Sequence, residues 1–305
     1  MRNNSNQTRL PNIALSVITA TVGLARLGYN AVCSPIGWGY DDFTTLAVLL
    51  AGVPSVVIID RMSIPSGLGR DVWAVPFPQI TTFVRSVYAL EILYFLQIVL
   101  VKATLLFFFL RIFPSQTTRR LIRYTLIFNT LYGAIFTFIA IIPCLPIPYY
   151  WTNWSEETSG RCVDINALAW ANAAISIVLD VWMLALPLHE VFRLQMSWRK
   201  RISVALMFFV GTFVTIVSMI RLRFLVVFAR GNNPTWDQAN VVNWSNIEIN
   251  VGIICTCLPT VRVMLTRALP RVLETTRLSS QSSSRKGSTY KMKILEDGPE
   301  PGSNM

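Results

Sequence analysis

The chain alternates between long apolar stretches and shorter polar segments. Four stretches are apolar on every face of a helix and reach the roughly 20 residues that a helix needs to cross the hydrocarbon core of a bilayer. They are 87–110, 121–142, 167–188 and 202–228. Two more, 43–59 and 241–265, are also taken as spans, although the first is short and the second contains Glu248 and Arg262. The pattern predicts transmembrane helices at these six places.

A seventh candidate span lies near the start of the chain. Its apolar part, 13–25, is short and runs into Arg26. It crosses a bilayer only if flanking residues such as Leu10 join it, and the alternative is a re-entrant or interfacial segment. With this span included, the chain is predicted to be an all-α, multi-pass transmembrane seven-helix bundle.

The composition supports a bilayer environment. Hydrophobic residues make up 53% of the 305 residues and charged residues only 14%, whereas roughly a quarter of an ordinary soluble domain is charged. The formal net charge of +11 would suggest a nucleic-acid partner in a soluble protein, but the basic residues lie between the apolar stretches. The expected partner is therefore the lipid bilayer and not nucleic acid.

The positions of Lys and Arg predict which side each loop faces, because positively charged loops stay in the cytoplasm. Most basic residues lie after the first, third, fifth and seventh spans. The N-terminus is therefore expected outside and the C-terminus in the cytoplasm, in a plasma membrane or an endomembrane. This divides the chain into an extracellular segment 1–12, a membrane domain 13–267 and a cytoplasmic tail 268–305. The Ser-rich, Gly-rich and Pro-rich tail has a composition typical of disorder.

Possible glycosylation sites agree with this orientation. The N-x-S/T acceptor sequence is modified only on the lumenal side of a membrane. Asn3, Asn6 and Asn153 begin such sequences on the predicted outer face. Short acceptor sequences also occur by chance, so they do not establish that any of these asparagines carries a glycan. They support the orientation because all three lie on the predicted outer side.

Two of the five cysteines are expected to form a disulfide. Cys144 and Cys162 flank the predicted outer loop between the fourth and fifth spans, in a compartment where a disulfide persists. Cys255 and Cys257 lie inside the last span and are expected to pack as apolar residues. With His189 as the single histidine, no zinc site and no other metal site is expected.

Ionisable residues inside the spans are the main candidates for chemistry, because a charge in lipid is costly and usually faces the bundle interior. Lys102 follows Glu91 by about three helical turns, so both point the same way with Lys102 roughly 16 Å deeper. Asp180 in the fifth span lies at a depth similar to that of Lys102. We expect Lys102 and Asp180 to pair, with a structural role favoured over a functional one.

A second group of charges is expected in the outer half of the bundle. Arg221 lies late in the sixth span and Glu248 early in the seventh, so both should lie near Glu91. One interpretation is a ligand pocket or active site, and the other is structural pairing between helices, with the aromatic residues as interfacial anchors. Possible aromatic walls are Tyr88, Tyr94, Trp170 and Trp244. The ligand-binding candidates are Glu91, Tyr94, Arg221, Trp244 and Glu248.

No cofactor is expected, and retinal in particular is improbable. Retinal forms a Schiff base with a lysine, which retinal proteins of the microbial type carry in the last span. The stretch 241–265 has no lysine, and Lys102 is the only lysine within a span. The last span also has Leu258-Pro259-Thr260 in place of the Asn-Pro-x-x-Tyr pattern of animal rhodopsin-like receptors.

Several short motifs occur in the order typical of one known family. They are Gly39-Tyr40-Asp41-Asp42, Lys102 before Phe109-Leu110-Arg111-Ile112-Phe113, Gly160-Arg161-Cys162-Val163-Asp164, and Trp244 with Glu248 before Cys257-Leu258-Pro259. Through these motifs the chain resembles, over about 13–267, the fungal rhodopsin-domain integral membrane proteins of the satratoxin-cluster, receptor-like type. The resemblance implies a seven-helix protein that is sometimes encoded beside genes of secondary metabolism.

Three functions are compatible with these observations. The favoured one is a receptor-like or sensor-like protein whose outer pocket binds a small lipophilic ligand and whose inner loops contact a cytoplasmic signalling partner. The alternative is a membrane-embedded enzyme acting on a lipophilic metabolite, with Glu91, Asp180 or Glu248 as the catalytic acid or base. A transporter ranks last, because the chain shows no convincing internal repeat.

Overall fold

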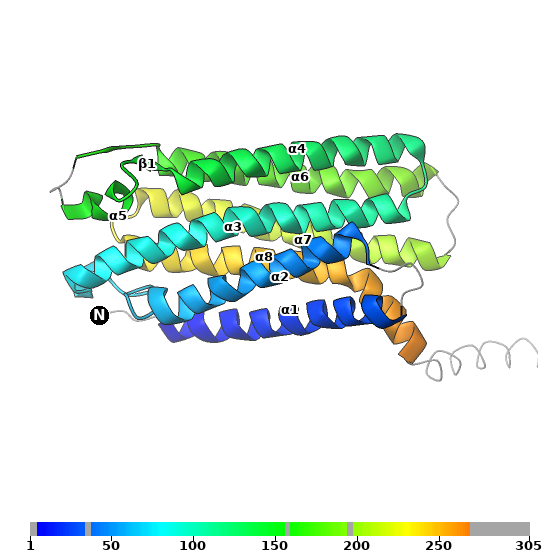
Figure 1. The fold of residues 1–305 in the computed structure, drawn as a ribbon, viewed down its shortest axis with the longest axis horizontal. Coiled ribbons are helices and arrows are strands. Elements are labelled where there is room, and N and C mark those ends of the chain that lie inside the picture. Colours follow the sequence, from blue (N-terminus) through cyan, green and yellow to red (C-terminus); the bar gives the residue numbers. More distant parts are fainter. Residues whose placement is uncertain (1–4, 34–37, 156–158, 194–197, 269–305) are drawn as a thin grey trace, which may run out of the picture. The chain divides into compact units, whose positions relative to one another are not determined.

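The computed structural model describes the chain except for residues 1–4, 34–37, 156–158, 194–197 and 269–305. The chain divides into two compact units, residues 1–258 and residues 259–305. The described part of the first unit is a bundle of long helices with one short hairpin at one end (Figure 1). The described part of the second unit is the end of the last helix. The predicted tail 268–305 falls almost wholly outside the described residues.

Seven helices in the described part of the chain are long and apolar enough to cross a membrane. They are α1 (Ser5–Cys33), α2 (Tyr40–Ile58), α3 (Phe77–Ile112), α4 (Gln116–Ile141), α6 (Ile165–Arg193), α7 (Trp198–Arg230) and α8 (Pro234–Ala268). Successive long helices of the first unit run in opposite directions (Figure 1). The prediction of an all-α, multi-pass seven-helix protein is therefore confirmed.

The first helix is longer than the sequence pattern indicated. Its apolar span covers 8–32, whereas the predicted span was 13–25 with a re-entrant or interfacial segment as the alternative. The difference arises because polar residues recur on one face of α1 and are buried in the bundle: Thr8, Asn12, Thr19, Arg26 and Asn30. Leu10, Val17 and Leu24 lie between them in sequence and are exposed. A polar face that packs inward shortens the apolar run without shortening the helix.

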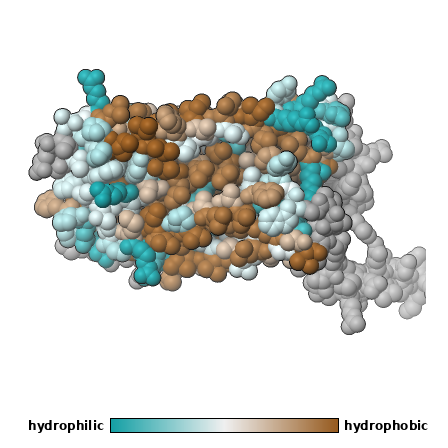
Figure 2. Space-filling model, in the orientation of Figure 1, coloured by the Kyte–Doolittle hydropathy of each residue, from teal (hydrophilic) through white to brown (hydrophobic). Residues whose placement is uncertain are grey.

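The outer surface of the helices is apolar. Large hydrophobic residues are exposed on six of the seven long helices, all except the described part of α8, and include Val53 on α2, Phe138 on α4 and Phe209 on α7. Figure 2 shows hydrophobic residues across the middle of the visible face and hydrophilic residues toward its two ends. This distribution suits a bundle surrounded by lipid, in which the interior and not the surface carries the polar groups.

Helix α3 is the most deeply buried of the seven spans. It begins at Phe77, before the predicted start at residue 87, with Pro78 in its first turn, where a missing backbone N–H costs nothing. Leu106 and Phe109 of α3 pack with Ile122 of α4 and with Met183 and Leu186 of α6. This packing places the inward-facing residues of α3 at the centre of the bundle.

One end of the bundle, called the hairpin end from here on, carries the connection between α4 and α6. Strands β1 (Cys144–Leu145) and β2 (Arg161–Cys162) pair antiparallel, and α5 (Tyr149–Thr152) and the 3-10 turn η3 (Asn153–Ser155) lie between them. Cys144 and Cys162 are opposite each other in the hairpin and form a disulfide. The π-helical turn η1 (Ile59–Ser63) and the 3-10 turn η2 (Val72–Ala74) connect α2 to α3.

Candidate functional site

A cavity of about 380 Å³ lies in the hairpin-end half of the first unit and is called the larger cavity. Residues of α2, α3, α5, α6, α7 and α8 line it. Its walls are mainly apolar, and its polar lining residues are Ser55, Glu91, Tyr94, Gln97, Tyr150, Asn166, Asn172, Arg221, Gln238, Ser245 and Asn246. An apolar cavity of this volume with a few converging polar groups is typical of a small-molecule site.

A buried ion pair from two helices lies beside the larger cavity. Arg221 of α7 and Glu248 of α8 are 4% and 1% exposed, and Arg221 Nε lies 3.4 Å from Glu248 Oε2. Tyr94 of α3 contacts both partners. Its hydroxyl donates to Glu248 Oε2 at 3.0 Å, and the guanidinium carbon of Arg221 lies 4.2 Å from the centre of its ring. The pair and the ring contact offset the cost of holding these charges in an apolar bundle.

Two nitrogen donors beside the larger cavity make no hydrogen bond within the described structure. Arg221 Nε is close to Glu248 but does not meet the geometry of a hydrogen bond with it, and Asn172 Nδ2 is likewise buried without an acceptor. Both residues line the cavity. A buried donor without an acceptor costs roughly 1 to 3 kcal/mol, so a ligand oxygen that accepts from either nitrogen would stabilise the protein.

Ser218 joins the Arg221–Glu248 pair to a second buried pair. Its Oγ is hydrogen-bonded to Glu248 Oε1 and lies 3.2 Å from Asp180 Oδ2. Asp180 Oδ1 accepts a short hydrogen bond from Lys102 Nζ, which also donates to the Ser176 carbonyl at 2.9 Å. The five residues Lys102, Asp180, Ser218, Arg221 and Glu248 are called the charge network. It contains two cations and two carboxylates, so its formal charges balance.

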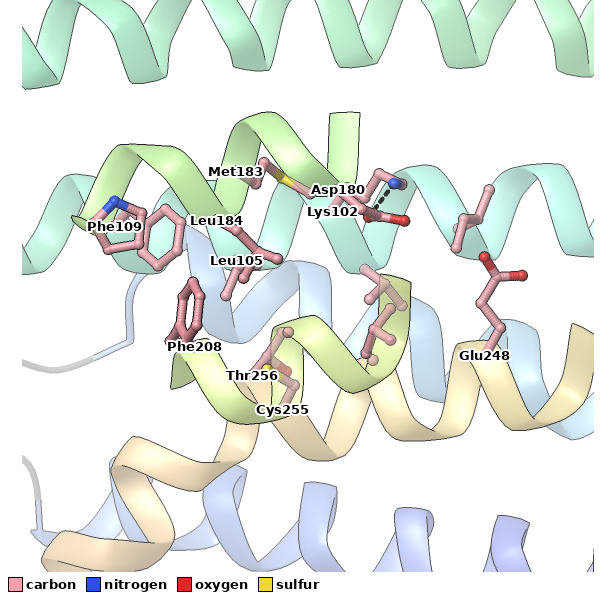
Figure 3. A pocket seen from close by; sticks show the side chains of 16 residues that line it. Lys102, Leu105, Phe109, Asp180, Met183, Leu184, Phe208, Glu248, Cys255 and Thr256 are labelled. Atoms are coloured by element: carbon pink, nitrogen blue, oxygen red, sulfur yellow. Dashed lines mark hydrogen bonds and ion pairs between the residues drawn. The ribbon is translucent and has the colours of Figure 1, made fainter. Parts of the chain in front are cut away.

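Residues of the charge network line both the larger cavity and a smaller cavity of about 50 Å³. Arg221 lines the larger cavity, whereas Lys102, Asp180 and Glu248 line the smaller one. Figure 3 shows Lys102 and Asp180 paired beside the smaller cavity, with Phe109, Met183 and Phe208 farther along it. A change at Arg221 can therefore reach the smaller cavity through directly contacting side chains.

The sequence pattern predicts an outer cluster of charges and a separate inner pair. The structure brings Lys102 to Asp180 and Arg221 to Glu248, and Ser218 makes the two pairs continuous. Ser218 was missed because a lone serine in an apolar helix carries no distinctive signal. It lies three residues before Arg221, however, which places the two side chains on one face of α7.

Glu91 lines the larger cavity but makes a contact of a different kind. Its Oε2 accepts a hydrogen bond of 3.2 Å from the hydroxyl of Tyr150 in α5. Burial, together with the negative charge of Glu91, raises the pKa of Tyr150 well above its ordinary value, so the hydroxyl stays protonated and keeps donating. Tyr150 was not singled out in the sequence, because nothing in the pattern indicated that the outer loop folds onto α3.

The predicted aromatic walls are only partly present. Tyr94 lines the larger cavity, whereas Tyr88, Trp170 and Trp244 are absent from its lining. Trp244 stacks on Phe224 with ring centres 6.1 Å apart, and Tyr88 packs against Tyr150 and donates to the Ile141 carbonyl. Trp244 therefore belongs to the packing contacts between α7 and α8 and not to the lining of the larger cavity.

The predicted glycosylation sites differ in how far the structure describes them. Asn153 begins η3 and is exposed at the hairpin end, while Asn3 and the side chain of Asn6 lie outside the described residues. Cys255 and Cys257 are buried free cysteines in α8. The orientation of the bundle in a membrane stays a prediction.

A further set of buried charges lies where α1, α2, α3 and α8 meet, at the end of the bundle opposite the hairpin (Figure 1). Arg26 is 0% exposed and donates to Asp41 Oδ2 and to the Thr256 carbonyl, each at 2.6 Å. Asn30 donates to Asp42 Oδ1 at 2.8 Å. With Arg111, whose Nη1 lies 3.5 Å from Asp41 Oδ1, these form the loop-end cluster of Arg26, Asn30, Asp41, Asp42 and Arg111.

The loop-end cluster was not predicted from the sequence, because Arg26 follows an apolar run and Asp41-Asp42 precede the apolar stretch 43–59. A signal was present. An arginine late in one span and two aspartates at the start of the next lie at the same membrane depth when a short loop joins the two helices.

Residues 25–267 match the sequence profile of the fungal rhodopsin domain. The chain is 34% identical over 182 residues to a SAT4 family membrane protein of Emericella nidulans, covering 58% of this chain and 44% of that relative. It is 28% identical to the satratoxin biosynthesis SC1 cluster protein 4 of Stachybotrys chartarum, covering 67% and 72% of the two chains. It is 26% identical to Receptor GIN3 of Arthrobotrys oligospora, covering 36% and 27%.

The match thus spans less than half of the length of the Emericella nidulans and Arthrobotrys oligospora relatives. No solved structure matches the chain.

Proposed function

The chain belongs to the fungal rhodopsin domain family, and from this we propose that it is a receptor-like or sensor-like membrane protein that binds a small lipophilic ligand in the larger cavity without retinal. The observation that carries the proposal is the buried Arg221–Glu248 pair beside a cavity of about 380 Å³. The lysine that retinal chemistry would need is absent from α8, and Lys102 is bonded to Asp180.

The cavity lining suggests the chemistry of the ligand. Apolar side chains such as Phe83, Leu90 and Ile249 favour an apolar body. Arg221 Nε and Asn172 Nδ2 are buried donors without acceptors, so they favour an oxygen acceptor on that body. A carboxylate or a carbonyl on a hydrocarbon frame meets both requirements, and a carboxylate gains further from the charge of Arg221.

The charge network supplies a route from the ligand to the opposite end of the bundle. Ser218 has one hydroxyl proton and two carboxylates within reach, so it donates to Glu248 or to Asp180 but not fully to both. A ligand that draws Arg221 away from Glu248 leaves the Glu248 carboxylate without its cation. Glu248 then attracts the Ser218 hydroxyl proton more strongly than Asp180 does. Asp180 then loses its hydrogen bond from Ser218, and this change affects the smaller cavity between α3, α6, α7 and α8, which Asp180 lines. A cytoplasmic signalling partner would respond to the resulting change in the helices around that cavity.

The relatives support the receptor reading and one alternative. Receptor GIN3 carries the word receptor in its name, whereas the satratoxin relative and the fugralins biosynthesis cluster protein 2 of Gibberella zeae are named after biosynthesis clusters. A membrane-embedded enzyme is therefore the second candidate. Its carboxylate would be Glu91, which lines the larger cavity and accepts from the Tyr150 hydroxyl.

A binding experiment tests the proposal. The protein in lipid nanodiscs is heated with increasing dodecanoic acid, a lipophilic carboxylate probe, and with dodecane as the apolar probe. Stabilisation should depend on the carboxylate, because a ligand that binds the folded state raises the unfolding temperature. Arg221→Lys keeps the positive charge beside Glu248 but loses the planar donors, and should weaken the apparent affinity by about tenfold.

The control variant is Arg223→Gln, because Arg223 is exposed on the same helix two residues away. It should bind the probe as the unaltered protein does. Equal responses to acid and alkane, or equal weakening by both variants, would contradict the proposal. Chemically altered probe recovered after incubation, but not with Glu91→Gln, would favour the enzyme instead.

A further inference from the structure

A third cavity, also lined mainly by apolar residues, opens on the lipid-facing side of the bundle. It has a volume of about 260 Å³, lies between α1, α2 and α8, and is called the groove. Val17 of α1 and Val53 and Val57 of α2 line it and are 59%, 62% and 52% exposed. All three lie within the membrane spans of their helices, so the mouth of the groove faces the acyl chains of a surrounding bilayer.

The groove lies next to the larger cavity. Ser55, Gln97, Asn246 and Ile249 line both spaces. Gln97 of α3 is 2% exposed, and its Nε2 donates to Ser55 Oγ at 2.6 Å and to the Ala51 carbonyl at 2.9 Å. The four shared residues therefore mark the boundary between the two spaces, and Gln97 is held against α2 there.

The groove also contains polar atoms that nothing in the described structure satisfies. Thr19 lines it and is 2% exposed, yet its Oγ1 makes no hydrogen bond, and Ser16 Oγ in the same groove is also buried without a partner. In most helices a threonine hydroxyl in lipid bonds to its own backbone, as Thr21 does with the Val17 carbonyl at 2.8 Å. A plain acyl chain offers such hydroxyls no partner, whereas a lipophilic molecule with a carboxyl or carbonyl group does.

From these three features we propose that the groove is a lateral entrance through which the lipophilic ligand passes from the bilayer, between α1 and α2, into the larger cavity. The buried hydroxyls of Ser16 and Thr19 hold the polar group of the ligand inside the groove. Gln97 then releases Ser55 as the ligand crosses the boundary. This inference rests on the proposed function, because it names the source of the ligand and its path to the same site.

Gly52 of α2 offers a way to close the entrance without disturbing the helices. It lines the groove, and a Cβ placed on it would meet no heavy atom within 4 Å. Gly52→Leu and Gly52→Phe should therefore fill open space rather than overpack a contact. The matched control is Gly28→Phe, since a Cβ on Gly28 also meets nothing within 4 Å and Gly28 does not line the groove.

The test measures how fast a probe enters. Diazirine-labelled dodecanoic acid is mixed rapidly with protein in nanodiscs, and the adduct formed by a light flash is followed against mixing time. Gly52→Phe should slow adduct formation in the larger cavity by about tenfold, Gly52→Leu by less, and both should reach the same final yield if given time. Gly28→Phe should behave as the unaltered protein does.

Other outcomes would overturn the inference. Unchanged rates in both Gly52 variants, with Arg221-dependent binding intact, would mean that the ligand enters elsewhere, for example past α5, or that the groove holds bilayer lipid only. That result leaves the proposed function standing. A probe that forms no adduct in the larger cavity of the unaltered protein would instead overturn both the entrance and the binding function.

Discussion

Arg26 Nη2 of α1 lies 2.6 Å from Asp41 Oδ2 of α2, and the two side chains are 0% and 5% exposed. The same guanidinium reaches Asp42 and the Thr256 carbonyl, so one side chain joins α1, α2 and α8. A cation in the bundle interior is costly by itself. Here two aspartates and a carbonyl surround it, which explains how an arginine can be part of the first membrane span.

Removing one partner from this cluster should strongly destabilise the protein. Arg26→Gln leaves Asp41 and Asp42 buried with one fewer cation, and we expect it to lower the free energy of unfolding by about 3 to 5 kcal/mol. The measurement is thermal or denaturant unfolding of the protein in detergent. Arg61→Gln is the control, because Arg61 is 81% exposed where it faces Asp60, and it should leave stability unchanged. Equal effects would contradict the structural role of the cluster.

The sequence predicted the type of fold well and the positions of the polar residues less completely. Apolar length alone located six spans, because lipid imposes the same requirement on every helix. Apolar length underestimated the length of α1, because the polar residues of this helix face inward and interrupt the apolar run. Membrane depth, estimated from helix rise, matched Lys102 with Asp180. The sequence did not indicate the roles of Ser218 and Tyr150. The contact of Ser218 depends on the rotation of α7 about its axis, and the contact of Tyr150 depends on how the hairpin connection folds.

The Lys102–Asp180 pair can be tested for a structural or a functional role. Lys102→Met leaves Asp180 without its cation and should cost about 3 to 5 kcal/mol of unfolding free energy. The double variant Lys102→Met with Asp180→Leu removes both charges and should recover most of that loss. Unfolding in detergent gives the stabilities, and probe binding gives the function. If the double variant is stable and still binds but no longer changes conformation on binding, the pair serves signalling as well as folding.

Ser218 should couple the two halves of the charge network. Ser218→Ala removes the hydroxyl shared by Glu248 and Asp180 and should cost about 1 to 3 kcal/mol of unfolding free energy. Binding of dodecanoic acid should persist, while the change in amide hydrogen exchange that binding causes around the smaller cavity should disappear. Thr212→Ala is the control, because within the described part of the chain the Thr212 hydroxyl donates only to the Phe208 carbonyl of its own helix. Loss of the exchange response in both variants would argue against a specific route through Ser218.

The orientation of the bundle can be tested at the hairpin end. If this end faces the lumen, as the distribution of Lys and Arg predicts, the exposed Asn153 is accessible to glycosylation and the Cys144–Cys162 disulfide lies in an oxidising compartment. Glycosidase treatment should then shift the protein on a gel, and the shift should be smaller in Asn153→Gln. A reporter fused after Met305 should read cytoplasmic. A lumenal reporter would reverse the orientation and place the larger cavity nearer the cytoplasm.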